Sequence, residues 1–321
     1  MSAEHAEKPN VVGFGPVYVD ILGYDVDFES LSPGKELIGG RYDLVIGGSA
    51  ANFVRVINKM GIKSVFIGKT GDDDMGELME KLAERESFPH EFLLTPGVQT
   101  SISENNSNSE GKVGMSIFGD ASSTFTSDEL MDGIEAYLGD AKILYAGGIF
   151  KLPNIVSTFD ALASRAHEAE MKIVLDHGRI DHSKVKDETL SKVREIIPLV
   201  DYYLPSREEF CDLWGVKSIQ EGLEKLAQIA PNTTVVVKDD KNGCATRKGG
   251  KIVVVEAFPV EKAAYQVGAG DTFNGAFISA IMKGLDTVSA MKYANAAGAL
   301  KVSQPGVPTV EQIDDFIAKI R

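Results

Sequence analysis

The 321-residue sequence is poor in cysteine and histidine and has no long hydrophobic run. Its two cysteines, Cys211 and Cys244, stand in unrelated contexts, which argues against a disulfide framework or a zinc site. The five histidines show no metal-binding spacing such as HExxH. No segment approaches the roughly 18 apolar residues of a membrane span, and "MSAEHAEKPN" lacks the apolar part of a signal peptide. We therefore expect a cytoplasmic protein without a membrane partner.

Positive charge is also scarce. The 33 lysines and arginines are outnumbered by 47 aspartates and glutamates, so the net charge is −14. An acidic surface repels a phosphate backbone, which argues against a nucleic-acid partner. It does not exclude a small phosphate ligand, because a local cluster of backbone amides can bind one whatever the net charge.

Several nucleotide-binding and hydrolase motifs are incomplete. "GFGPVY" begins like a dinucleotide fingerprint, but Tyr18 stands at the third glycine position. "GKT" resembles the end of a P-loop, but Lys63 replaces its first glycine and three aspartates follow at once. No GxSxG motif is present, so nothing indicates a serine hydrolase.

Short β-branched runs alternate with segments of helical apolar spacing, which predicts a mostly parallel sheet covered by helices on both faces. The expected strands are residues 10–15, 64–68, 142–148, 172–176, 201–205 and 234–238. The expected helices are residues 50–60, 75–86, 155–169 and 206–214, and residues 271–321 are almost all helical with a break at 303–308.

Two segments interrupt this alternation. Residues 23–45 lack helical periodicity, and residues 100–118 read as two strands around a polar hairpin loop. Together they predict a small β-sheet that stands off the main domain as a lid. The alternative is two unrelated loop excursions.

The stretch "VGAGDTFNG" carries the clearest chemistry. If a helix begins near Asp271, the amides of Gly268, Ala269 and Gly270 converge at its positive end and form an anion hole. Small residues let a phosphoryl group approach the backbone. Asp271 is then placed to accept a proton from an attacking hydroxyl, as phosphoryl transfer requires. The alternative is that Asp271 merely caps the helix after a glycine turn.

A second glycine cluster favours the functional interpretation. "GGSAAN" at residues 47–52, "MGIKSVFIGKTGDDDMG" at 60–76 and "ANAAGALKVSQPGVPT" at 294–309 accompany the motif around Asp271. With them, nearly the whole chain resembles the PfkB (ribokinase-like) family of sugar and nucleoside kinases. The resemblance implies a single α/β domain over residues 1–321, with a three-layer α/β/α fold, a mostly parallel central sheet and a β-sheet lid. It also implies ATP-dependent phosphorylation of a primary hydroxyl of a sugar, with Asp271 as general base.

The resemblance assigns further residues to each substrate. Those that would contact the sugar are Asp20, Gly47, Gly48, Asn52 and Arg179, the last from "LDHGR". Those that would contact ATP are Lys238, Gly243 and Asn295, and Glu209 in "PSREEF" matches a glutamate that influences the bound Mg²⁺. Family members also lead us to expect a homodimer joined through the lid.

Three departures from the family pattern bear on nucleotide and cation use. Ser206 replaces the asparagine of the NxxE motif, and Asp240 places a negative charge near the expected phosphates. Tyr265 and Gln266 replace the Asp-Thr pair before the glycine run, so a carboxylate that helps bind a monovalent cation is missing. Activation by potassium is therefore not expected.

Two alternatives remain open at this point. A nucleoside kinase needs apolar walls for the base, which Phe28, Tyr42 or Phe118 in the lid could supply. A non-catalytic sugar- or nucleotide-binding protein is favoured by the three departures, whereas the intact motif around Asp271 favours an enzyme. A hydrolase that uses Asp271 has little support, because no second base or metal cluster is visible.

Overall fold

A computed structural model describes residues 8–28, 36, 39–108 and 113–319. Among these residues, nine strands form the central sheet, in the order β13-β12-β11-β10-β9-β8-β1-β4-β5. All neighbours from β11 to β5 are parallel, and β12 and β13 form an antiparallel hairpin at one edge. The strands are β1 (Val11–Phe14), β4 (Ser64–Gly71), β5 (His90–Thr95), β8 (Ile143–Gly147), β9 (Lys172–Asp176), β10 (Tyr202–Tyr203), β11 (Thr234–Lys238), β12 (Cys244–Lys248) and β13 (Lys251–Val255).

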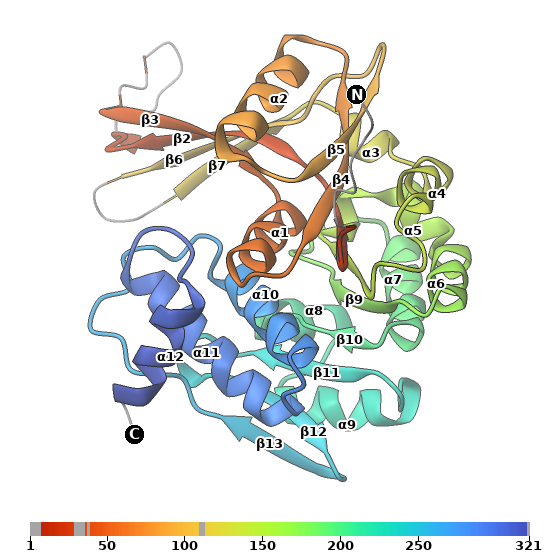
Figure 1. Cartoon of the computed structure of the whole chain (residues 1–321), viewed down its shortest axis with the longest axis vertical. Helices are drawn as coiled ribbons and strands as arrows, with labels where there is room; N and C mark the ends of the chain where they lie inside the picture. The colour runs from red at the N-terminus through yellow and green to blue at the C-terminus, as the bar shows by residue number, and fades with distance from the viewer. Residues whose placement is uncertain (1–7, 29–35, 37–38, 109–112, 320–321) are drawn as a thin grey trace.

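Helices cover both faces of this sheet (Figure 1). Successive strand residues point to opposite faces, so Val12 and Phe14 join one apolar core and Val11 joins the other. The helices on the Val11 face are α1 (Ser49–Lys59), α2 (Asp74–Glu86), α10 (Ala269–Met282), α11 (Thr287–Ser303) and α12 (Val310–Lys319). The opposite face carries α3 (Ala121–Thr124), α4 (Ser127–Glu135), α5 (Pro153–Ser157), α6 (Phe159–Glu168), α7 (Asp187–Ile196), α8 (Arg207–Trp214) and α9 (Ile219–Ile229). The predicted three-layer α/β/α architecture is confirmed.

Two of the expected helices are divided. The segment 155–169 breaks at Thr158, because the hydroxyls of Ser157 and Thr158 donate to the Asn154 carbonyl and compete with the helical bonds. The C-terminal segment has a break after α10 that was not expected. Gly284 adopts φ +88° there, and Asp286 then caps α11 by accepting from the Val288 amide.

A four-stranded small sheet stands off the main domain at the upper left of Figure 1. Its order is β3-β2-β6-β7, and β2 is antiparallel to β3 and parallel to β6. The strands are β2 (Tyr18–Tyr24), β3 (Arg41–Gly47), β6 (Ile102–Ser107) and β7 (Val113–Phe118). The sheet starts earlier than the expected segment 23–45, because β2 follows directly on β1. Parts of both expected segments, 29–35, 37–38 and 109–112, lie outside the described residues.

Three short 3-10 helices complete the described structure: η2 (Ile149–Lys151), η3 (Ile197–Leu199) and η4 (Asp240–Asn242).

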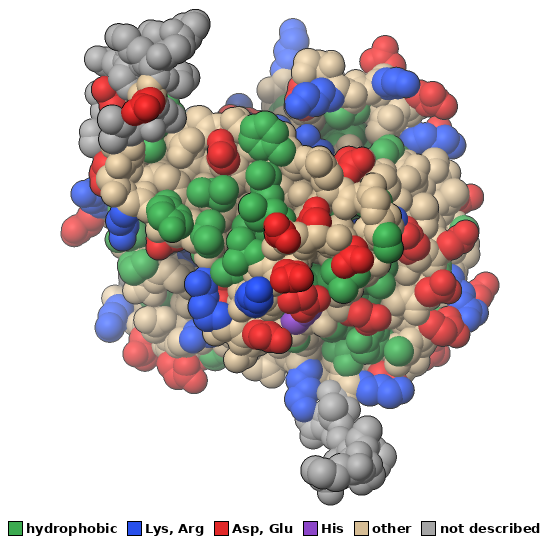
Figure 2. Space-filling model, turned by 90° about the horizontal axis from the view of Figure 1, so that it is seen from above, with side chains coloured by type: hydrophobic (Ala, Val, Ile, Leu, Met, Phe, Trp, Pro, Cys, Tyr) green, Lys and Arg blue, Asp and Glu red, His purple; other side chains and the backbone are tan. Residues whose placement is uncertain are grey.

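Seen from above, a patch of hydrophobic side chains lies beside groups of acidic side chains (Figure 2). In the part of the chain that the structure describes, no helix is both long enough and apolar enough to cross a bilayer.

Candidate active site

The candidate site lies beyond the carboxyl ends of the parallel strands, where ligands bind in open α/β sheets. The N-termini of α1 and α10 meet there, and Ser49 and Asn52 on α1 reach the side chain of Asp271 on α10. The two helices are 222 residues apart in sequence at this contact. The first helix and the glycine motif, predicted separately from sequence, therefore form one site.

Asp271 lies in the first turn of α10 and does not cap it. The N-cap is Gly268, in the left-handed conformation with φ +79°, so the alternative that Asp271 caps the helix is wrong. The Ser49 hydroxyl donates to Oδ1 of Asp271 at 2.5 Å, and Nδ2 of Asn52 donates to Oδ2 at 2.8 Å. Burial raises the pKa of Asp271 to about 6, although both hydrogen bonds act to lower it. The group is thus a carboxylate at neutral pH with a high affinity for a proton.

The glycine loop before Asp271 leaves backbone donors available. The amides of Gly268 and Gly270 have no hydrogen-bond acceptor among the described residues, whereas the Ala269 amide donates to the Gln266 carbonyl at 3.1 Å. A Cβ atom built on Gly270 would contact nothing nearer than Nζ of Lys238, at 3.7 Å. Gly270 therefore has room for a group of methyl size, and the Lys238 ammonium borders that room.

Arg55 orients one partner of Asp271, and the sequence analysis did not predict it. Its Nη1 donates to Oδ1 of Asn52 at 2.9 Å, and its Nη2 donates to the Ile46 carbonyl on β3 at 2.8 Å. These bonds fix which way the Asn52 amide faces, so that its NH₂ group points at Asp271. Residues three apart on a helix share a face, so the spacing of Asn52 and Arg55 was a sequence signal for this contact.

Where the resemblance predicts a sugar, Asp20 on β2 packs directly against Gly47 on β3. A Cβ atom at position 47 would overlap the Asp20 carboxyl group, so any larger residue would displace that side chain. Burial raises the pKa of Asp20 to about 6, against the effects of a Ser103 hydrogen bond and the Arg55 charge. Gly48 has φ +113° and turns the chain from β3 into α1. Arg55 thus acts on both carboxylates, on Asp20 through its charge and on Asp271 through the orientation of Asn52.

Arg179 follows β9 and is exposed. Within the described ranges it has no hydrogen bond or ion pair. It lies just after Asp176, whose side chain is buried at the same strand end.

Lys238 ends β11 and lies in a buried polar network. Its Nζ donates to Oδ2 of Asp176 at 2.8 Å, to the Leu204 carbonyl at 2.6 Å and to Oδ1 of Asn274 at 3.1 Å. Asn274 also donates to Asp176 at 2.6 Å and to the Tyr145 hydroxyl at 3.1 Å. Burial acts to raise the pKa of Asp176, but the charge and hydrogen bond of Lys238, together with His177 and Asn274, lower the pKa below its ordinary value. All three ammonium protons of Lys238 thus have acceptors within the protein.

Gly243 and Asn295, also expected at the nucleotide, both lie against the end of β13. Gly243, with φ +93°, turns the chain from η4 into β12. Nδ2 of Asn295 on α11 donates to the Val255 and Glu256 carbonyls at the end of β13. A groove of about 400 Å³ runs along residues 255–259, with Lys292 and Ile317 on its other side.

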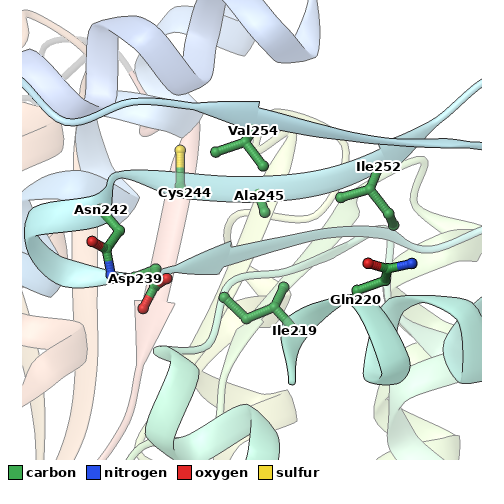
Figure 3. A pocket seen from close by; sticks show the side chains of 8 residues that line it. All are labelled: Ile219, Gln220, Asp239, Asn242, Cys244, Ala245, Ile252 and Val254. Carbon is green, nitrogen blue, oxygen red and sulfur yellow. Dashed lines mark hydrogen bonds between the residues drawn. The ribbon is translucent and has the colours of Figure 1, made fainter. Parts of the chain in front are cut away.

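A second hollow, of about 230 Å³, lies between α9 and the β12–β13 hairpin (Figure 3). Its lining includes Ile219, Ala245 and Ile252, which pack with the core on the opposite face of the sheet from α10. It is therefore separate from the site around Asp271.

Glu209 takes part in a capping box at the start of α8. Its Oε2 accepts from the Ser206 amide at 2.9 Å and from the Ser206 hydroxyl at 2.7 Å. The backbone of Ser206 also forms a parallel β-bridge with that of Lys238, so this helix start lies beside the buried network. Within the described part of the chain, no group of three or more His, Cys, Asp or Glu side chains is arranged to hold a metal ion.

Comparison with known proteins agrees with this geometry. The chain is 29% identical over 330 residues to the 5-dehydro-2-deoxygluconokinase of Clostridium perfringens, covering 98% of this chain and 95% of that protein. It is 25% identical over 301 residues to the ribokinase of Haemophilus influenzae, covering 89% and 91%.

Solved structures share the fold. An Arabidopsis thaliana ribokinase complexed with ribose and ATP has a TM-score of 0.77 at 21% identity, covering 97% of this chain and 99% of that one. A putative ribokinase II from E. coli, in complex with ATP and Mg²⁺, has a TM-score of 0.79 at 20% identity with the same coverage. The model of the pfkB family carbohydrate kinases matches residues 8–313. Site geometry, fold and sequence therefore agree, and this chain belongs to the pfkB family of carbohydrate kinases.

Proposed function

We propose that this carbohydrate kinase transfers the γ-phosphoryl group of ATP to a primary hydroxyl group of a sugar or sugar derivative. The observation that carries the proposal is the carboxylate of Asp271, held by Ser49 and Asn52 beside the unpaired amides of Gly268 and Gly270. A base next to an anion hole is the arrangement that phosphoryl transfer to a hydroxyl needs. The names of the two relatives, a ribokinase and a 5-dehydro-2-deoxygluconokinase, support a sugar-like acceptor.

In the proposed mechanism Asp271 is the general base. The acceptor oxygen attacks the γ-phosphorus, its proton passes to Asp271, and the bond between the γ-phosphorus and the bridging oxygen breaks to release ADP. With a pKa of about 6, Asp271 is mostly ionised at neutral pH and still basic enough to accept the proton. The amides of Gly268, Ala269 and Gly270, at the positive end of α10, stabilise the charge on the transferred group. For Ala269 this requires release of the bond to the Gln266 carbonyl.

The sugar would lie between β2, β3 and α1. Asp20 would accept hydrogen bonds from sugar hydroxyls, and the close approach of Gly47 and Gly48 would let the ring sit against the backbone. Asn52 would serve both the sugar and Asp271, because Arg55 orients its amide. Arg179 is exposed at the same edge of the sheet and would contact a polar or acidic group on the substrate.

ATP would lie across the loop before α10, with Lys238, Gly243 and Asn295 along its side. The residues present fit a phosphoryl group, because Gly270 has room beside it and the Lys238 ammonium borders that room. Lys238 would act through its charge, or exchange one of its three acceptors for a phosphate oxygen. Bound Mg²⁺ would neutralise phosphate charge, held mainly by phosphate oxygens and water, with Glu209 acting on it from a distance.

The small sheet would act as the lid of this single domain, closing over the sugar and excluding water. Its outer strands carry large exposed side chains: Tyr42 on β3 is 68% exposed, and Met115 and Phe118 on β7 are 59% and 54% exposed. A second copy of the chain could bury these groups, which supports a homodimer through the lid.

The proposal is tested by ADP release with ribose, 5-dehydro-2-deoxygluconate, other sugars and nucleosides as acceptors, using Asp271→Asn as the control. We expect turnover with a sugar, lowered by a factor of about 100 or more in the variant, since loss of a general base typically has that effect. Full turnover of the variant would refute the role of Asp271. Turnover with nucleosides alone would refute the sugar acceptor.

A further inference from the structure

The C-terminal turn of α11 holds the loop that leads into the glycine motif. The Val302 carbonyl accepts from the Ala264 amide at 2.9 Å and from the Tyr265 amide at 3.1 Å. Nζ of Lys301 donates to the Tyr265 carbonyl at 3.3 Å. A lysine in the last turn of a helix is favoured by the helix dipole, so this end of α11 is a stable place for the charge.

The side chain of Lys301 extends along the anion hole itself. A Cβ atom built on Gly268 would lie 3.8 Å from Cε of Lys301 and 4.0 Å from Nδ2 of Asn52, which is bonded to Asp271. Burial lowers the pKa of Lys301, and the negative charge of Asp271 acts in the opposite direction. An ammonium group therefore lies within electrostatic reach of both the hole and the base.

Lys301 stands where the local charge would otherwise be unfavourable. Tyr265 and Gln266, on the held loop, carry no charge that could bind a metal cation beside the hole. Asp271 is negative and a γ-phosphoryl group adds further negative charge, whereas the Lys238 ammonium that borders Gly270 is already paired with Asp176. A cation tethered to a helix supplies the opposite charge without an ion-binding equilibrium.

We propose that Lys301 is a positioning residue for phosphoryl transfer: its ammonium group anchors the loop before α10 and serves as the built-in cation of the anion hole. The proposal rests on the proposed function and goes beyond it by naming the source of this charge. It would account for turnover without a bound monovalent cation.

The test compares Lys301→Met and Lys301→Ala with Lys59→Met. Lys59 is an exposed lysine in the last turn of α1 and has no part in the proposed anion hole. We expect kcat for sugar-dependent ADP release to fall by about 10 to 100-fold in both Lys301 variants, less than the loss of a donor that bonds the transition state directly. Lys59→Met should be unchanged, and wild-type turnover should be the same in potassium and choline chloride.

Chemical rescue separates a charge from a structural support. Methylammonium chloride should restore part of the turnover of Lys301→Ala, and tetramethylammonium, which cannot donate a hydrogen bond, should not. Unchanged kcat in Lys301→Met, or loss in Lys301→Ala without selective rescue, would overturn the proposal. A strong potassium requirement of the wild type would also overturn it.

A binding measurement keeps this result separate from failure of the proposed function. If the wild type transfers no phosphoryl group to any acceptor, the proposed function fails. The effect of the charge at the hole is then measured by calorimetry, as the affinity for adenylyl imidodiphosphate in the presence of Mg²⁺. Weaker binding by Lys301→Met than by Lys59→Met supports the built-in cation, and equal binding refutes it.

Discussion

Replacing Asp271 with asparagine should stabilise the fold in a pH-dependent way, even though it removes the proposed base. The pKa of Asp271 is raised from 3.8 to about 6, mainly by burial. Because the folded-state value lies above the unfolded one, the folded protein prefers the protonated group. The penalty for ionising it is absent below pH 3.8, grows between pH 3.8 and 6, and is complete above pH 6.

The size of this penalty follows from the shift. Each pKa unit corresponds to about 1.4 kcal/mol, so ionised Asp271 lowers the free energy of unfolding by roughly 3 kcal/mol at neutral pH. About half of that is already present at pH 5, which leaves a change of roughly 1.4 kcal/mol between pH 5 and pH 7.5. The asparagine also changes the bonds to Ser49 and Asn52, but this contribution does not depend on pH.

The assay is urea unfolding of the wild type and Asp271→Asn at pH 5 and pH 7.5. The difference in the free energy of unfolding, variant minus wild type, should become more positive at the higher pH. Asp286→Asn is the matched control, because Asp286 is an exposed helix cap whose pKa is lowered by Ser289 and Lys248. It is ionised in both states over this range, so its difference should stay constant. The same constancy for Asp271→Asn would refute the raised pKa.

Three further predictions concern activity. In the wild type, kcat/KM should fall below pH 6. Ser49→Ala should move this acid limb upward by about one pH unit, because the Asp271 carboxylate loses a hydrogen-bond donor. An unmoved limb would contradict the Ser49 contact. Arg55→Met should lower kcat by about 10-fold with little change in the KM for ATP, because Asn52 loses its orientation; a rise in that KM alone would argue against it. Gly47→Ala should abolish sugar-dependent turnover, because the new methyl group would meet the Asp20 carboxyl, and normal turnover would contradict the close packing of these two residues.

Much of the fold was predictable because its strands are continuous apolar runs. The predicted strands at 172–176 and 234–238 match β9 and β11 residue for residue. A buried parallel strand must be apolar on both faces, which leaves a clear signal in the sequence. The hairpin of β12 and β13 at the sheet edge was missed: β12 ends in exposed charged residues that weaken the signal, whereas β13 carries a β-branched run that the prediction did not use.

Local chemistry predicted the candidate site only where one short segment contains it, and the family resemblance supplied Asn52 as a sugar contact rather than as a partner of Asp271. The residues of "GAGD" are adjacent in sequence, so their convergence at a helix start followed from the helix itself. The partners of Asp271 were not predictable, because Ser49 and Asn52 come from a helix more than 200 residues away. Nothing local marks a serine or an asparagine as the group that orients a distant carboxylate.

Sequence by itself thus determined the α/β architecture, the family and the position of Asp271 behind its glycine motif, because these depend on local patterns of hydrophobicity and small residues. Tertiary structure alone decided the electrostatics. Burial raised the pKa of Asp271, folding placed Lys238 on Asp176, and the end of α11 brought Lys301 to the anion hole. A charge acts through distance and desolvation, and both quantities exist only once the chain has folded.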